Sequence, residues 1–209
     1  MRFTAPRLLA AALLVALIAA PAFALAQSGP PPRGPSYGSL QDDDGFFLRR
    51  GLAGGLGFGL GALSTDSGIF DCPDCVVHPV AVSISGHLGW MLDHRTSLGG
   101  AYWGQVQRLD FHGDAYGWQH MLMGAVQHWL TPQFWIKGGL GLASLQVSYW
   151  DGFAEELNVG TAVMAAAGYE VIFTPDFAFD IQVRLGSGMY RYVSDRASTA
   201  VIGVGVSWY

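Results

Sequence analysis

The sequence predicts an all-β protein, an eight-stranded antiparallel up-and-down transmembrane β-barrel. Three observations lead to this fold class. The chain is 51% apolar and only 13% charged, and it contains 29 glycines. After the first 26 residues it has no run of about 18 apolar residues that could cross a bilayer as a helix. Its apolar residues instead alternate with Gly, Ser or Ala, and a period of two is the signature of strands.

The first 26 residues have the organisation of a secretory signal peptide. Arg2 and Arg7 precede an apolar run over 8–20, and the small residues at 24–26 form a cleavage site before Gln27. A transmembrane helix is the alternative, but the run is short and no stop-transfer flank follows. We therefore expect export, with a mature chain of nine basic and sixteen acidic residues and a net charge of −7. This charge gives no indication of nucleic-acid binding.

Residues 27–47 are rich in Pro and Asp and lack periodicity, so they are expected to form a disordered leader, and residues 48–209 the barrel. Each expected strand is close to the 9–11 residues that cross a bilayer at a tilt. The expected strands cover about 52–62, 80–90, 98–107, 119–130, 134–143, 160–171, 177–186 and 201–209.

The connections between these strands alternate in length. Three are tight, at 93–95, 131–133 and 174–176, and the four between them are longer and more polar. The segments LTPQF at 130–134 and FTPDF at 173–177 repeat one turn design. Short turns alternating with longer loops are typical of outer-membrane barrels. A secreted β-sandwich is the alternative, but its second strand face would carry many charges, whereas here that face is mostly Gly, Ala and Ser.

The chain resembles the small outer-membrane barrels of the OmpX, OmpA and OmpW type over about 51–209, and more narrowly an outer membrane β-barrel domain family. The features that carry the resemblance are GGLGFG at 54–59, Cys-x-x-Cys at 72–75 and KGGLG at 137–141. It implies a location in the bacterial outer membrane, contact with its lipids and lipopolysaccharide, and neither a cofactor nor an enzymatic activity. The strand 201–209 resembles the C-terminal signal read by the barrel-assembly machinery, although Tyr209 is one step out of phase with the lipid face.

Cys72 and Cys75 lie in the first long connection. In an exported chain they are expected to form a disulfide within that connection. A metal site that also uses His78 is the alternative, but a closed zinc site usually needs two separated ligand pairs.

Five polar side chains are expected to point into the lumen from the fifth, sixth and seventh strands: Lys137, Glu170, Asp180, Gln182 and Arg184. The formal charges of the four ionisable groups sum to zero, as expected where water is scarce. The tight turn at 174–176 places Glu170 almost opposite Asp180, so Lys137 and Arg184 should lie beside these carboxylates and plug the barrel.

Two further groups of residues suggest other activities. Ser83, Ser85 and His87 share the inward face of the second strand, and Ser/His chemistry is used by barrels that modify lipid A, but no acid is paired with His87. Aromatic residues of the outer connections suggest either a binding surface or an interfacial girdle: Tyr116, Trp118, Tyr149, Trp150, Phe153, Tyr190 and Tyr192.

Three functions are therefore weighed. The first is a non-enzymatic barrel that is structural or binds partners at the cell surface. The second is a narrow channel for small or apolar solutes, although an eight-stranded barrel is only wide enough for its own side chains to fill. The third is a lipid A-modifying enzyme.

Overall fold

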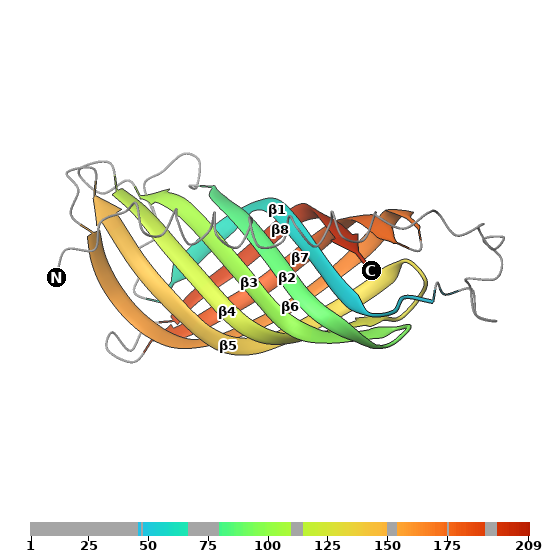
Figure 1. Cartoon of the computed structure of the whole chain (residues 1–209). Coiled ribbons are helices and arrows are strands. Elements are labelled where there is room, and N and C mark those ends of the chain that lie inside the picture. Colours follow the sequence, from blue (N-terminus) through green and yellow to red (C-terminus); the bar gives the residue numbers. More distant parts are fainter. Residues whose placement is uncertain are drawn as a thin grey trace, which may run out of the picture. The chain divides into compact units, whose positions relative to one another are not determined.

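The computed structural model describes Phe46 and residues 48–66, 80–109, 115–149, 154–174, 176–190 and 196–209. In these residues eight antiparallel strands pair in chain order, and the last pairs with the first to close a barrel (Figure 1). The strands are β1 (Leu52–Thr65), β2 (Ala81–Asp93), β3 (Thr96–Leu109), β4 (Ala115–Trp129), β5 (Phe134–Tyr149), β6 (Ala154–Phe173), β7 (Phe177–Tyr190) and β8 (Arg196–Trp208). The predicted fold class is confirmed. The described part of the chain contains no helix that is long and apolar enough to span a membrane.

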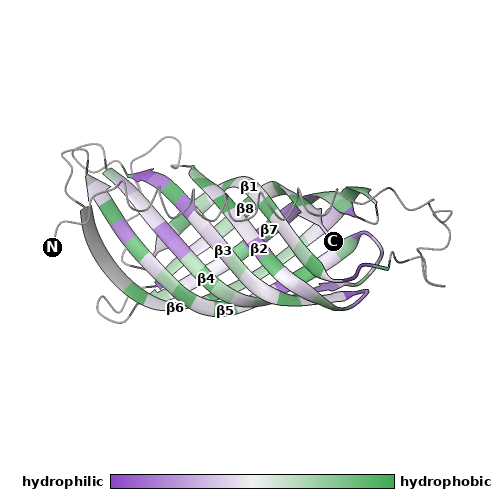
Figure 2. Cartoon of the chain, viewed as in Figure 1, coloured by the Kyte–Doolittle hydropathy of each residue, from purple (hydrophilic) through white to green (hydrophobic). Residues whose placement is uncertain are grey.

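The outer surface of the barrel is built from the apolar half of the period-two pattern. Leu56, Leu122 and Leu140 are 65–70% exposed there, and further Leu, Ile, Val and Phe side chains of the strands share this surface. Figure 2 shows hydrophobic residues alternating with less hydrophobic ones along the strands. Water would oppose so large an exposed apolar area, whereas lipid favours it. The pattern that predicted the strands is therefore also the pattern that fits the barrel to a bilayer.

Three short turns lie at one end of the barrel, which we call the turn end; the opposite end is the loop end. Asp93 pairs with Thr96 across the first turn, and Trp129 pairs with Trp135 next to the second. In the second and third turns a threonine hydroxyl accepts a hydrogen bond from the N–H of the following phenylalanine, Thr131 from Phe134 and Thr174 from Phe177. The two repeated sequence segments thus form the same turn.

The strands are 13–20 residues long and extend further toward the loop end than the sequence pattern indicated. Tyr116 and Trp118 therefore lie in β4 rather than in an outer connection. The expectation that Tyr190 belongs to the exposed loop aromatics is wrong, because it ends β7 with its side chain inside the barrel, where only 4% is exposed. The alternation is hard to recognise in these extensions because their outward positions are often polar.

Candidate functional site: the barrel lumen

The lumen holds the buried charged side chains of the described residues. Arg49, Glu170, Asp180 and Arg184 are each 0–2% exposed, and Lys137 also lines the interior. Burial of a charge is costly unless a partner or a hydrogen bond compensates it. The lumen is therefore where these residues interact specifically, and we treat it as the candidate site.

The turn end of the lumen is closed around Glu170. Its Oε2 accepts a hydrogen bond from Arg49 Nη2 at 2.7 Å, and its Oε1 accepts from Trp129 Nε1 at 2.7 Å and from the Tyr209 hydroxyl at 2.8 Å. The Arg49 guanidinium also lies 4.6 Å from the ring centre of Trp129 and 4.8 Å from that of Tyr209. The carboxylate thus has three donors, and its cation contacts two aromatic rings that pack edge to face, with their centres 5.6 Å apart. This arrangement compensates both buried charges.

Tyr209 explains the irregular end of the last strand. Trp208 follows the lipid-facing phase, whereas Tyr209 enters the lumen and donates its hydrogen bond to Glu170. Burial and the neighbouring Glu170 carboxylate raise the pKa of the Tyr209 phenol well above its usual value. The phenol therefore keeps its proton and remains a donor at physiological pH.

Phe46 packs beneath this cluster. It lies in the segment expected to form a disordered leader, yet it is 4% exposed and contacts a group of buried apolar residues. The Arg95 guanidinium lies over its ring, 3.9 Å from the ring centre. The members of the apolar group are Phe46, Ala53, Met91, Trp129 and Trp135.

Side chains also cross the lumen toward the loop end. Trp103 of β3 donates to Ser83 Oγ at 2.6 Å, and it reaches Gly186 on β7, where a Cβ would lie 2.5 Å from its ring. Next to it Gln105 and Thr199 are hydrogen-bonded, as are Gln105 and Gln119. Gln119 in turn donates to the Tyr190 hydroxyl at 2.8 Å. A continuous chain of hydrogen bonds therefore joins β8, β3, β4 and β7 across the interior.

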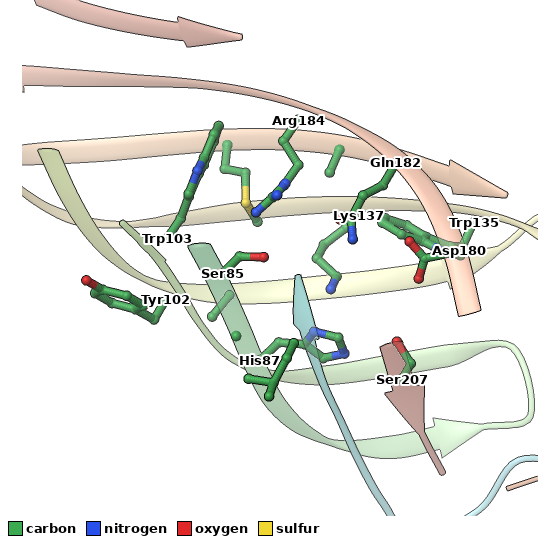
Figure 3. A pocket seen from close by; sticks show the side chains of 15 residues that line it. Ser85, His87, Tyr102, Trp103, Trp135, Lys137, Asp180, Gln182, Arg184 and Ser207 are labelled. Carbon is green, nitrogen blue, oxygen red and sulfur yellow. The ribbon is translucent and has the colours of Figure 1, made fainter. Parts of the chain in front are cut away.

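A cavity of about 30 Å³, lined by both apolar and polar side chains, lies between these two sets of contacts. Ser85 and His87 enter it from β2, Lys137 from β5, and Gln182 and Arg184 from β7 (Figure 3). Trp103 and Trp135 form opposite parts of its wall, and Asp180 lies beside Trp135 (Figure 3). A volume of this size accommodates about two water molecules.

The five lumen residues expected from the sequence all point into the barrel, and Glu170 pairs directly with Asp180 in the register of β6 and β7. Their interactions differ from the expectation. Arg49, and not Lys137 or Arg184, forms the ion pair with Glu170. None of the three Arg184 guanidinium nitrogens has a hydrogen-bond partner among the described residues, and the same is true of Asp180 Oδ1.

The candidate lipid-modifying residues lie inside the barrel. Ser83 is fully buried and accepts the hydrogen bond from Trp103, while Ser85 and His87 line the cavity. The two serines and the histidine are therefore separated from the lipid face by the barrel wall.

The cysteine pair cannot be placed. Cys72, Cys75 and His78 lie outside the described residues. Among the residues that are described, no three His, Cys, Asp or Glu side chains lie close enough to hold a metal ion.

The residues that the sequence analysis missed are those that complete the turn-end cluster. Arg49 precedes β1 and belongs to no alternating pattern, so nothing in the sequence singled it out. For Tyr209 the sequence did contain an indication, because in the alternating pattern Tyr209 falls on the inward face and Trp208 on the lipid face. A final aromatic residue in the inward phase indicates a polar partner in the lumen, which here is Glu170.

Comparison with known proteins gives the fold. No protein-family model matches the chain, and no curated protein matches it. The structure of Ail from Yersinia pestis with the heparin analogue sucrose octasulfate superposes with a TM-score of 0.51 at 11% identity, over 77% of this chain and 100% of Ail. Neisserial surface protein A gives 0.49 at 12% identity, over 75% and 95% of the two chains. OprG from Pseudomonas aeruginosa gives 0.41 at 12%, over 80% and 100%.

Proposed function

We propose that this small outer-membrane β-barrel is a non-enzymatic envelope protein, structural or surface-binding, whose lumen does not conduct solutes. The observation that carries the proposal is the double closure of the lumen. Arg49, Trp129, Glu170 and Tyr209 interlock at the turn end, and Trp103 and its hydrogen-bonded neighbours cross the barrel toward the loop end.

Both closures consist of side chains held by several contacts each. Glu170 has three donors, and Gln119 contacts both Gln105 and Tyr190. A solute would have to break several buried hydrogen bonds at each level, and polar groups left unpaired in a barrel interior are costly. The cavity between the two closures is open, but its volume of about 30 Å³ holds only about two water molecules.

The outer surface supports the membrane location and two kinds of partner. Its exposed Leu, Ile and Val side chains fit lipid tails, and Trp90, Tyr169 and Phe177 lie exposed near the turn end, where aromatic rings suit a membrane interface. We include outer-membrane lipids and lipopolysaccharide among the proposed partners. We also include the barrel-assembly machinery, which would recognise strand 201–209.

Single-channel recording tests the closed lumen. Purified protein in a planar bilayer should give no conductance steps at molar salt, although its insertion is confirmed by flotation of the protein with lipid vesicles. A general porin in the same bilayer serves as the positive control. Regular steps from the wild-type protein would contradict the proposal and favour a narrow channel.

The membrane location predicts a simple gel result. The protein should fractionate with the outer membrane, and an unheated sample should migrate differently from a boiled one, because a closed barrel resists detergent until it is heated. Recovery of the protein in the soluble periplasmic fraction, with no effect of heating on migration, would disprove the location.

A further inference from the structure

The charges of the described side chains inside the barrel do not balance once Arg49 is included. Three basic side chains enter the lumen among the described residues, namely Arg49, Lys137 and Arg184. Two carboxylates enter it with them, Glu170 and Asp180. Arg49 and Glu170 neutralise each other in an ion pair of 2.7 Å. Among the described side chains, Asp180 is then the one carboxylate left to compensate Lys137 and Arg184, and Lys137 also lies 5.2 Å from the ring centre of Trp135. His87, which also faces the cavity, can add a positive charge but never a negative one.

The strand register brings the two remaining cations together. Lys137 of β5 pairs with Ala166 of β6, and Ala166 pairs with Arg184 of β7. The two Cα atoms are thus two strand spacings apart, about 10 Å, with only a methyl side chain between them. Two like charges directed from this row into one small cavity repel each other. Asp180 lies four residues from Arg184 on the same face of β7, which is about 13 Å along the strand.

Arg184 shows where compensation is missing. It is 2% exposed, and its Nε and both Nη atoms have no hydrogen-bond partner among the described residues. Its contact with the Trp103 ring, at 5.6 Å from the ring centre, compensates charge only in part. A buried guanidinium whose three nitrogens all lack a partner among the described residues requires an acceptor.

Glycines of β1 lie against three of the side chains that line the cavity. A Cβ at Gly57 would lie 2.6 Å from Ser85 Oγ and 3.1 Å from Gln182 Nε2, and a Cβ at Gly59 would lie 3.1 Å from Arg184 Nη2. A side chain at either position would displace these polar groups. The Gly-rich segment that opens β1 therefore leaves room for the side chains that line the cavity.

We propose that this cavity is a binding site for a small monovalent anion of the size of chloride, held between Lys137 and Arg184. Donors from Ser85, Gln182 and His87 surround the same space (Figure 3). Water would satisfy the hydrogen bonds of Arg184 but would leave one positive charge in a medium of low dielectric constant. A halide accepts the hydrogen bonds of Arg184 and also neutralises the positive charge. It is only slightly larger than a water molecule, so the cavity of about 30 Å³ accommodates it. Sulfate or gluconate is too large.

Anion-dependent stability tests the site in solution. The purified, folded protein is unfolded by heat at constant ionic strength while chloride replaces gluconate. The unfolding temperature should rise with chloride and saturate, because a ligand that binds only the folded state stabilises it by mass action. Bromide should act like chloride. An unfolding temperature that does not depend on the anion, and changes only with pH, would overturn the proposal and indicate that Lys137 is neutral instead.

Matched variants identify the residues. Lys137→Met should abolish the chloride effect, or reduce the apparent affinity at least about tenfold, and in chloride-free medium it should be at least as stable as the wild type. Arg196→Gln removes an arginine from the outer face of β8 and should leave the chloride effect unchanged. Loss of the effect in Arg196→Gln but not in Lys137→Met would refute a lumenal site.

Diffraction gives a test that needs no variant. Crystals of the wild type grown in bromide should show an anomalous peak between the Lys137 ammonium and the Arg184 guanidinium. Ordered water at this position without an anomalous peak would overturn the proposal.

Discussion

Replacement of Arg49 by alanine is expected to destabilise the barrel by about 3–5 kcal/mol, the usual cost of removing one partner of a buried ion pair. Glu170 is fully buried and would retain only two neutral donors, Trp129 and Tyr209. The aromatic contacts of the guanidinium would be lost as well. Urea unfolding of the protein in lipid vesicles, followed by tryptophan fluorescence, measures this cost.

The neighbouring residue provides the control. Arg50 is exposed and carries the same charge, so Arg50→Ala should change the free energy of unfolding by less than about 0.5 kcal/mol. The double substitution of Arg49→Met with Glu170→Gln should recover most of the lost stability, because no charge is then left unpaired. If Arg49→Ala and Arg50→Ala were equally mild, Arg49 would not stabilise the turn end.

The strands and turns of the barrel were predictable because one surface faces lipid. That surface accepts only apolar residues, so the alternation is regular where the barrel crosses the membrane, as in β7, where Ile181, Val183 and Leu185 alternate with Gln182 and Arg184. Turn chemistry then set the register, and it placed Glu170 opposite Asp180 correctly. The loop-end extensions have a polar outer face, so their alternation is weak and their lengths were underestimated.

The contacts across the lumen were not predictable in the same way. Which inward residues meet depends on strand tilt and on the stagger of the closed sheet, and neither follows from a period of two. Lys137 and Arg184 were therefore expected beside both carboxylates, whereas Arg49, which lies outside every strand, forms the ion pair with Glu170. The sequence predicted which side chains point inward and the sign of each charge. The ion pair that Glu170 forms was seen only in the structure, and so was the excess positive charge that this pair leaves.

Closure of the barrel between β1 and β8 depends on close backbone approach, and Gly203→Ala should cost about 1–3 kcal/mol, as overpacking does. Gly203 pairs with Gly59 on the lumen side. A Cβ at residue 203 would lie 2.8 Å from the Gly59 Cα and 3.0 Å from the Phe58 carbonyl carbon. Both atoms belong to the backbone of β1, so the clash cannot be relieved by rotation of a side chain, and the two strands must separate.

Gly100→Ala is the matched control, because it makes the same substitution within a strand. Gly100 is exposed on the outer face of β3, and a Cβ there would meet no atom within 4 Å. Both substitutions restrict the unfolded chain equally, and at a site without strain this effect stabilises by about 0.4–1 kcal/mol. Gly100→Ala should therefore raise the urea midpoint slightly while Gly203→Ala lowers it, and a larger fraction of Gly203→Ala should migrate as unfolded protein on an unheated gel. Equal midpoints for the two variants would show that the backbones of β1 and β8 can separate without cost, and that closure does not depend on the Gly59–Gly203 pair.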